Sequence, residues 1–240
     1  MKDAVVIIPT YNEIENIEAI VRAVFSQKKA FDILVVDDSS PDQTAARVRF
    51  LQNEFKGQLH LLSRSGKTGL GTAYIAGFQW SLEKDYQYIF EMDADFSHDP
   101  NDLSKLYHAC AVGGADLSIG SRYVNGVNVV NWPMSRVLMS YGASKYVRFI
   151  TRMNICDTTA GFVCYKRKVL ETINLKEIKF VGYAFQIEMK FKAYLKNFKI
   201  VEVPVIFTDR VRGKSKMSGG IISEAIFGVI KMKFNSFFRS

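Results

Sequence analysis

The stretch Tyr88-Ile89-Phe90-Glu91-Met92-Asp93-Ala94-Asp95 carries an apolar run directly into two carboxylates one residue apart. The run predicts a buried strand, which places both carboxylates at the carboxyl end of that strand. Ligands bind at this edge of open α/β sheets, where carboxylate oxygens can hold a hard divalent cation against a diphosphate. Ser97 offers a further oxygen ligand, directly or through water. The stretch therefore favours a metal and diphosphate site in an α/β fold, although a solvated turn also fits so short a motif.

Strands and helices are expected to alternate on both sides of this stretch. Apolar runs at 5–8, 33–36, 59–62, 88–91 and 117–119 alternate with segments whose apolar residues recur at helical spacing. This alternation predicts an α/β fold with a mostly parallel, Rossmann-like sheet flanked by helices. After residue 120 the pattern predicts a polar loop, helices near 134–150 and 184–195, and strands near 200–203 and 205–207.

Two further loops at strand ends carry groups suited to a nucleoside. In Pro9-Thr10-Tyr11-Asn12-Glu13, Tyr11 can stack on a base and Glu13 can accept hydrogen bonds. The same loop could instead be a plain helix start with Asn12 as N-cap. In Val36-Asp37-Asp38, two acids follow a buried run, and Asp38 can accept hydrogen bonds from the N–H groups of a base.

The glycine-rich loop Gly66-Lys67-Thr68-Gly69-Leu70-Gly71 is interpreted as structural. A phosphate-binding P-loop needs a Gly at position 61, and the dinucleotide fingerprint needs one at position 74, and neither is present. The glycines instead predict a close-packed entry into a helix over 72–82. His98 is interpreted as a surface loop residue, because imidazole is a poor ligand for a hard cation.

Charge and cysteine content narrow the class of protein. The 32 basic and 24 acidic side chains give a net charge of +8, and the excess lies late in the chain. A charge of this sign favours nucleic acid, anionic lipid or phosphorylated substrates as partners, or serves solubility alone. Of these partners, we do not expect nucleic acid. The three cysteines lack the spacing of a disulfide framework or a zinc site. No apolar stretch reaches the length of a membrane span, and no secretory signal is recognised, so a cytoplasmic location is expected.

These loops, taken in order, resemble those of glycosyltransferase family 2, and in particular the dolichol-phosphate (polyprenyl-phosphate) mannose synthases. The resemblance covers nearly the whole chain and rests on residues 9–13, 36–42, 69–71, 92–95, 120–123 and 210–216. The run 92–100, the tripeptide Asn131-Trp132-Pro133 and the segment 210–216 are similar to the synthase branch. The resemblance implies the nucleotide-sugar-binding fold called GT-A.

The resemblance also implies roles for individual residues. The nucleotide sugar would be bound by Pro9, Tyr11, Glu13, Val36, Asp38, Asp93, Ala94 and Asp95. Asp93, Asp95 and Ser97 would hold Mg²⁺ or Mn²⁺. The acceptor phosphate would be contacted by Arg122, Arg136, Arg210, Arg212 and Lys216. Asp93, Asp95, Arg122 and Arg210 would form the catalytic set.

The chain is assigned to one catalytic domain with a C-terminal appendage. Residues 1–218 form the GT-A domain, with 1–120 as the nucleotide-sugar-binding half and 121–218 as the acceptor half. Residues 219–240 are expected to form an amphipathic helix. Its apolar stripe fits either the protein core or the surface of an anionic membrane.

The expected reaction needs no general base. A phosphate monoester, with a second pKa of about 6, is largely dianionic at neutral pH and is already a nucleophile. Its approach to the donor diphosphate meets a repulsion of roughly 4 kcal/mol per pair of unit charges at 4 Å. A metal ion on the carboxylates and the basic residues of the acceptor half would offset that repulsion.

The sequence therefore predicts an inverting, metal-dependent transfer of mannose from GDP-mannose to a polyprenyl (dolichyl) monophosphate. The enzyme would associate peripherally with the cytoplasmic face of a membrane, alone or through a membrane-anchoring subunit. A UDP-sugar such as UDP-glucose is the alternative donor, with a lipid or polysaccharide acceptor. A catalytically silent regulator that binds nucleotide or lipid is the alternative from outside the enzymes.

Overall fold

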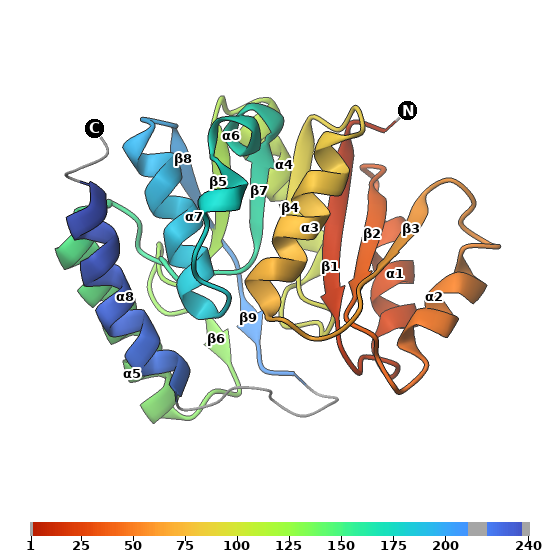
Figure 1. Cartoon of the computed structure of the whole chain (residues 1–240), viewed down its shortest axis with the longest axis horizontal. Coiled ribbons are helices and arrows are strands. Elements are labelled where there is room, and N and C mark those ends of the chain that lie inside the picture. The colour runs from red at the N-terminus through yellow and green to blue at the C-terminus, as the bar shows by residue number, and fades with distance from the viewer. Residues whose placement is uncertain (1, 211–219, 237–240) are drawn as a thin grey trace.

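A seven-stranded sheet forms the centre of the molecule in a computed structural model (Figure 1). The structure describes residues 2–210 and 220–236, without the side chains of 183 and 220–226. The sheet contains β1 Ala4–Thr10, β2 Asp32–Asp37, β3 Leu59–Ser63, β4 Tyr88–Glu91, β5 Leu117–Ser121, β7 Val163–Lys166 and β8 Ile200–Pro204, in the spatial order β3-β2-β1-β4-β7-β5-β8. A separate two-stranded ribbon pairs β6 Val129–Val130 with β9 Phe207–Thr208.

All strands of the main sheet except β7 run in the same direction. β7 lies between β4 and β5 and is antiparallel to both. The mostly parallel sheet predicted from the sequence is confirmed. The antiparallel strand was not predicted, because an apolar run such as 162–165 specifies a buried strand and not the direction of its partners.

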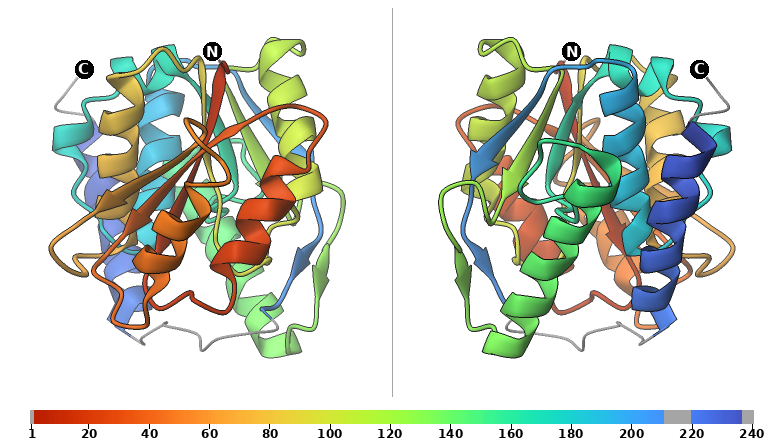
Figure 2. Two further views of the ribbon diagram at one scale, coloured as in Figure 1. Left: turned by 90° about the vertical axis from the view of Figure 1, so that its right-hand side faces the viewer. Right: turned by 90° about the vertical axis from the view of Figure 1, so that its left-hand side faces the viewer.

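Helices cover both faces of the sheet (Figure 2). They are α1 Ile17–Phe25, α2 Thr44–Leu51, α3 Leu70–Leu82, α4 Leu103–Ala111, α5 Met134–Thr151, α6 Arg167–Thr172, α7 Tyr183–Leu195 and α8 Gly220–Ser236, with single 3₁₀ turns at Pro100–Asp102 and Leu175–Glu177. Alternate residues of β1 enter two cores. Val5 and Ile7 pack with α3 and α7, whereas Val6 and Ile8 pack with α1 and α4. The period-two alternation of a strand produces both cores.

Two element boundaries differ from the sequence prediction for identifiable reasons. The helix expected at 72–82 begins at Leu70, because the glycines let the chain pack closely there. A Cβ on Gly71 would lie 2.8 Å from the Phe185 ring, so this position has room only for glycine. The strand expected at 205–207 is the short β9, Phe207–Thr208, which pairs with β6 outside the main sheet.

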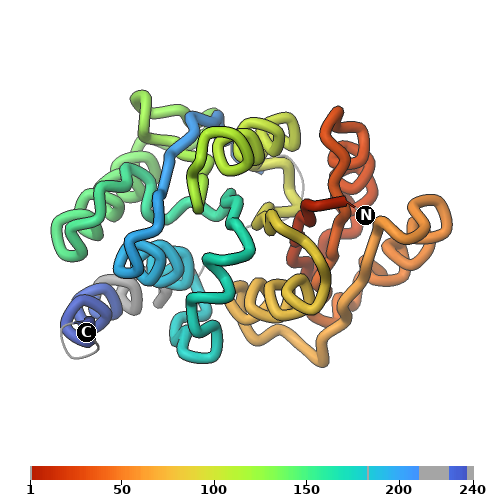
Figure 3. The backbone as a smooth tube through the Cα atoms, turned by 90° about the horizontal axis from the view of Figure 1, so that it is seen from above, coloured from red at the N-terminus to blue at the C-terminus, as the bar shows by residue number. Residues whose placement is uncertain are grey.

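Helices α5 and α8 lie beside each other at the end of the molecule opposite α2 (Figures 1 and 3). The C-terminal helix spans Gly220–Ser236, inside the predicted range 219–240. Val229 is fully buried in the core, whereas Phe227 and Phe234 are 72% and 61% exposed. The helix is therefore attached to the core by one face and presents apolar side chains on another. In the part of the chain that the structure describes, no helix combines the length and apolarity of a membrane span.

Candidate active site

The loops singled out by the sequence meet at one edge of the sheet because their strands are parallel neighbours. In the register, Pro9 of β1 lies opposite Val36 of β2, and Ile7 of β1 lies opposite Glu91 of β4. The carboxyl ends of these strands therefore bring the segments 9–13, 36–42 and 92–97 together. The convergence expected at this edge is what the structure contains.

The first two loops are tied together by side chains that serve structure. Asp37 accepts hydrogen bonds from the Thr10 hydroxyl at 2.9 Å and from the Ser40 backbone N–H at 3.0 Å. Asp42 accepts from the backbone N–H of Ile14 at 3.0 Å. These bonds give Asp37 and Asp42 structural roles, whereas Asp38 has a different partner. The N-cap of α1 is Asn16, four residues after Asn12.

Asp38 is paired with an arginine that the sequence analysis did not single out. Arg64 Nε lies 3.3 Å from Asp38 Oδ1, and both side chains are largely buried. Burial raises the pKa of Asp38, and the Arg64 charge opposes that shift. Within the described residues, Asp38 Oδ1 and Arg64 Nη1 have no hydrogen-bond partner. Nearby, the Lys67 ammonium lies 4.8 Å from the centre of the Tyr11 ring.

The metal loop holds its two carboxylates in different surroundings. Asp95 Oδ1 accepts from the Ser97 hydroxyl at 2.6 Å, and Asp95 Oδ2 lies 2.9 Å from Arg210 Nη2. Burial and the nearby charge of Asp95 raise the pKa of Asp93 to about 7. The charged form of the Asp93 carboxyl is therefore disfavoured unless a cation binds beside it, so the pair of carboxylates fits a divalent ion. Ser97 lies beside Asp95, to which its hydroxyl donates this hydrogen bond.

Asp93 is positioned by two residues whose contribution the sequence did not reveal. The Tyr74 hydroxyl donates to Asp93 Oδ1 at 3.4 Å, and the Asp93 backbone N–H donates to His98 Nδ1 at 3.2 Å. The expectation that His98 is a surface residue is wrong, because the ring is 5% exposed and stacks on Phe162 at 4.9 Å. Burial lowers the pKa of His98, which keeps Nδ1 available as an acceptor.

Three arginines of the expected acceptor set are each paired with a carboxylate. Arg122 donates from Nε and Nη2 to Asp157 at 2.7 and 2.6 Å, and it also donates to Thr159. Arg136 donates to Asp209 at 2.9 Å, and Arg210 contacts Asp95 as described. The remaining two predicted contacts, Arg212 and Lys216, lie outside the described residues. Asp157 and Asp209 were missed because only the fold reveals which acid meets which arginine.

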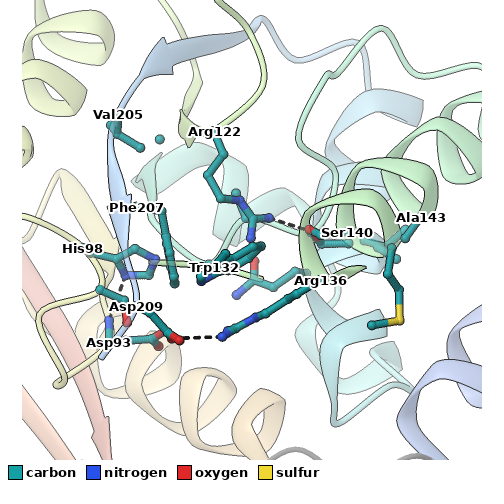
Figure 4. Close-up of a pocket in the computed structure, with 18 of the residues that line it drawn as sticks. Asp93, His98, Arg122, Trp132, Arg136, Ser140, Ala143, Val205, Phe207 and Asp209 are labelled. Carbon is teal, nitrogen blue, oxygen red and sulfur yellow. Dashed lines mark hydrogen bonds and ion pairs between the residues drawn. The ribbon is translucent and has the colours of Figure 1, made fainter. Parts of the chain in front are cut away.

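A cavity of about 530 Å³ joins these groups (Figure 4). One part of its wall is polar and carries Asp93, Arg122, Arg136 and Arg210. The other part is mainly apolar and is lined by Met139, Ala143, Tyr146 and Val147 of α5 and by Ile187 of α7. The cavity therefore places an acidic loop, several guanidinium groups and an apolar wall around one space.

Comparisons with known proteins agree with this arrangement. The sequence profile described as Glycosyl transferase family 2 matches residues 5–173. A polyprenol monophosphomannose synthase from Mycolicibacterium smegmatis is 49% identical over 224 residues, which are 93% of this chain and 84% of that protein. An undecaprenyl-phosphate mannosyltransferase from Micrococcus luteus is 45% identical over 227 residues, covering 94% of this chain and 91% of that protein.

A solved structure shares the fold at low sequence identity. It is a mannosyltransferase from Pyrobaculum calidifontis in complex with GDP-mannose and Mn²⁺, with a TM-score of 0.63 at 17% identity, covering 99% of this chain and 64% of that chain. The matches to both relatives extend over nearly the whole of this chain, and the family profile includes the segments 9–13, 36–42 and 92–97. The chain belongs to glycosyltransferase family 2 and is a glycosyltransferase of the polyprenyl-phosphate mannose synthase type.

Proposed function

We propose that this enzyme transfers mannose from GDP-mannose to a polyprenyl (dolichyl) monophosphate, with inversion at the anomeric carbon. The cavity carries the proposal, because it combines the three features that such a reaction needs. Asp93 in the cavity wall, with Asp95 beside it in the same loop, suits a metal-bound diphosphate. The arginines suit a second phosphate, and the α5 wall suits an isoprenoid chain. The names of the two mannosyl-lipid-forming relatives support the same acceptor class.

The arginines supply the positive charge that lets the acceptor phosphate lie next to the negatively charged donor. A dianionic phosphate needs no base, but it must lie close to the negatively charged donor. Arg122 and Arg136 would hold it by charge-assisted hydrogen bonds and orient one oxygen towards the anomeric carbon. Because these side chains are already fixed by Asp157 and Asp209, little reorganisation would accompany binding.

The cofactor in this proposal is Mg²⁺ or Mn²⁺ on Asp93 and Asp95, with Ser97 nearby. Among residues 2–210 and 220–236, no group of three or more Asp, Glu, His or Cys side chains could hold a metal. Two carboxylates suit an ion that takes its other ligands from phosphate and water. When bound, the ion would neutralise charge that develops on the leaving diphosphate. The solved relative that contains GDP-mannose also contains Mn²⁺.

The Asp38–Arg64 pair favours guanine over uracil. The guanine edge presents an acceptor, O6, followed by two donors, N1–H and N2–H. Arg64 can donate to O6 while both oxygens of Asp38 accept from the donors. On uracil a single donor, N3–H, lies between two carbonyl oxygens, so the second Asp38 oxygen would face an acceptor. The arrangement of the pair therefore supports GDP-mannose as the donor rather than a UDP-sugar.

With Mn²⁺ present, GDP is expected to bind about tenfold or more tightly than UDP, since a matched pair of base contacts contributes roughly 1–3 kcal/mol of discrimination. Isothermal titration calorimetry of both nucleotides measures the ratio. Arg64→Met should reduce it towards unity, whereas Arg49→Met, an exposed arginine of α2, should leave it unchanged. Equal affinity for the two nucleotides, or UDP-glucose consumption faster than GDP-mannose consumption, would contradict the guanine assignment.

In this proposal, residues 1–120 bind the nucleotide-sugar donor and residues 121–218 bind the acceptor. Helix α5 of the acceptor half and the C-terminal helix α8 expose large apolar side chains at the same end of the molecule (Figure 1). Met134, Leu138 and Phe149 of α5 are 64–70% exposed, and Phe227 and Phe234 of α8 are similarly exposed. We propose that this end of the molecule contacts the membrane peripherally at its cytoplasmic face, directly or with the help of an anchoring subunit.

Replacing both Phe227 and Phe234 by Ser is expected to weaken binding to anionic liposomes about tenfold, because two aromatic side chains lose their apolar burial. Vesicle co-sedimentation measures the change. Phe50→Ser is the matched control, since Phe50 is 60% exposed on α2 at the opposite end. Deleting 219–240 would be less informative, because it would also remove the buried Val229 from the core. Unchanged liposome binding by the double variant would refute this role for α8.

A further inference from the structure

We propose that Trp132 is a positioning residue that aligns two arginines for the acceptor phosphate. The inference rests on the proposed function, which assigns Arg122 and Arg136 to that phosphate. The guanidinium carbon of Arg136 lies 4.0 Å from the centre of the Trp132 ring, and that of Arg122 lies 5.5 Å from it. Figure 4 shows the indole in the space between the two arginines.

Two like charges directed at one anion repel each other before the anion arrives. The face of an indole attracts cations through its quadrupole, and Trp is the strongest aromatic side chain in this respect. A ring that contacts both guanidinium groups therefore offsets their repulsion and fixes their planes. Asp157 and Asp209 hold the outer ends of the same two arginines. Each arginine is thus paired with a carboxylate and lies over the shared indole. Arg122 also lies 5.2 Å from the centre of the Tyr123 ring and 5.5 Å from that of Phe207.

The tripeptide Asn131-Trp132-Pro133 has a structural explanation at each position. Asn131 adopts φ 63°, a left-handed conformation that Asn tolerates better than most residues, and it ends β6. Pro133 precedes the first residue of α5, the helix that carries Arg136. Trp132 lies between these two fixed points. The backbone of Trp132 is therefore fixed by a turn on one side and by the start of α5 on the other.

The β6–β9 ribbon positions Phe207 and Asp209 beside Trp132 and Arg136. Val129 and Val130 pair with Phe207 and Thr208, and the Asp209 backbone N–H donates to the Val130 carbonyl at 3.0 Å. The pairing places Phe207 against Trp132, with their rings 5.2 Å apart and at 68°. Because of this pairing, the Trp132 indole and the Asp209 carboxylate both contact Arg136.

A role in packing alone does not account for an indole at this position. The Trp132 Nε1–H is buried and has no hydrogen-bond acceptor among the described residues. A purely apolar ring would fill the space without burying an unpaired donor. The property that Trp adds here is the electron-rich face that both guanidinium groups contact.

Steady-state kinetics with polyprenyl phosphate test the proposal. Trp132→Leu is expected to raise the KM for the acceptor about tenfold, and Trp132→Phe, which keeps a ring face, about threefold or less. The KM for GDP-mannose should not change in either variant. In an Arg136→Gln background, Trp132→Leu should add less than about threefold, because Arg136, the nearer of the two arginines, is no longer there to be aligned and only the effect through Arg122 remains. Unchanged acceptor KM in Trp132→Leu, or fully additive effects in the double variant, would overturn the proposal.

Fluorescence gives a reading that does not require turnover. Trp80 and Trp132 are the two tryptophans of the chain, so Trp80→Phe leaves Trp132 as the single indole reporter. Titration with farnesyl phosphate should change its emission saturably, farnesol should not, and Arg136→Gln should weaken the phosphate response. Equal responses to the phosphate and the alcohol would overturn the positioning role. If the wild-type protein binds farnesyl phosphate in this way but forms no mannolipid, the proposed function fails and the Trp132 assignment survives.

Discussion

Replacing Asp93 by Asn is expected to lower the rate of mannose transfer by about 10³-fold or more, and to abolish Mn²⁺ binding at the site. The expected loss corresponds to roughly 4 kcal/mol of transition-state stabilisation, the scale of a metal-ion contribution. Asn keeps the shape of the side chain and its contact with Tyr74, so the change removes mainly the negative charge. Turnover with excess Mn²⁺ and metal binding by electron paramagnetic resonance are the two measurements.

Asp99→Asn is the matched control for this variant. Asp99 is exposed, lies four residues after Asp95 in the same loop, and accepts a capping hydrogen bond from the Asn101 backbone N–H at 2.9 Å. Asn is an equally good N-cap, so stability and transfer should both stay near wild type. Metal-dependent turnover at a wild-type rate in Asp93→Asn would remove the basis for the metal assignment.

Replacing Asp157 by Ala is expected to reduce the free energy of unfolding by about 3–5 kcal/mol and to impair use of the acceptor. Asp157 is fully buried and holds the largely buried Arg122 by two hydrogen bonds, so its loss leaves a buried charge without its partner. Glu202, which accepts the Asp157 backbone N–H at 2.8 Å, cannot replace it without giving up that bond. Urea denaturation and the acceptor KM measure the two effects.

Two comparisons separate the structural and functional roles of the pair. Glu171→Gln breaks the exposed Arg167–Glu171 pair and should cost at most about 1 kcal/mol. The double variant Arg122→Met with Asp157→Leu replaces both charges by apolar groups and should recover much of the stability while transfer stays low. A stable Asp157→Ala protein with normal acceptor KM would show that the pair neither supports the fold nor orients Arg122.

The stability contributed by Asp157 should depend on pH in a defined direction. Burial alone would raise the pKa of this carboxyl, but the charge and hydrogen bonds of Arg122 hold it below its usual value. A pKa that is lower in the folded protein than in the unfolded chain, where it is about 3.9, stabilises the fold fully above that pH. This stabilisation is lost as the pH falls from the pKa of the unfolded chain through the lower pKa of the folded protein. The loss of unfolding free energy in Asp157→Ala should therefore become smaller in acid.

The fold, and the meeting of three loops at one edge of the sheet, could be predicted because their determinants are local. The apolar run 88–91 and the acids after it specify a strand and its carboxyl-edge loop within eight residues, and the structure places that loop beside the segments 9–13 and 36–42. The sequence could not reveal β7 as antiparallel, since alternation says nothing of a strand's neighbours. The roles assigned to the site residues stay predictions.

The ion pairs of the acceptor side could be identified only in the structure. Arg122 meets Asp157 across 35 residues, and Arg136 meets Asp209 across 73. No spacing rule links residues so far apart, because the partner is chosen by the packing of β5, α5 and the β6–β9 ribbon. His98 was misplaced for the same reason. A histidine in a loop is expected to be exposed, and only the fold shows that the distant rings of Phe162 and Phe207 pack against His98.

Incorporation of radiolabelled mannose from GDP-mannose into organic-extractable polyprenyl phosphate tests the central claim most directly. The reaction is run with Mg²⁺ or Mn²⁺, with EDTA, and with UDP-glucose as the competing donor. Mannolipid that forms with either metal, disappears with EDTA and is little reduced by UDP-glucose is the expected result. No mannolipid in the presence of metal and membranes, or a product that forms equally well in EDTA, would contradict the account.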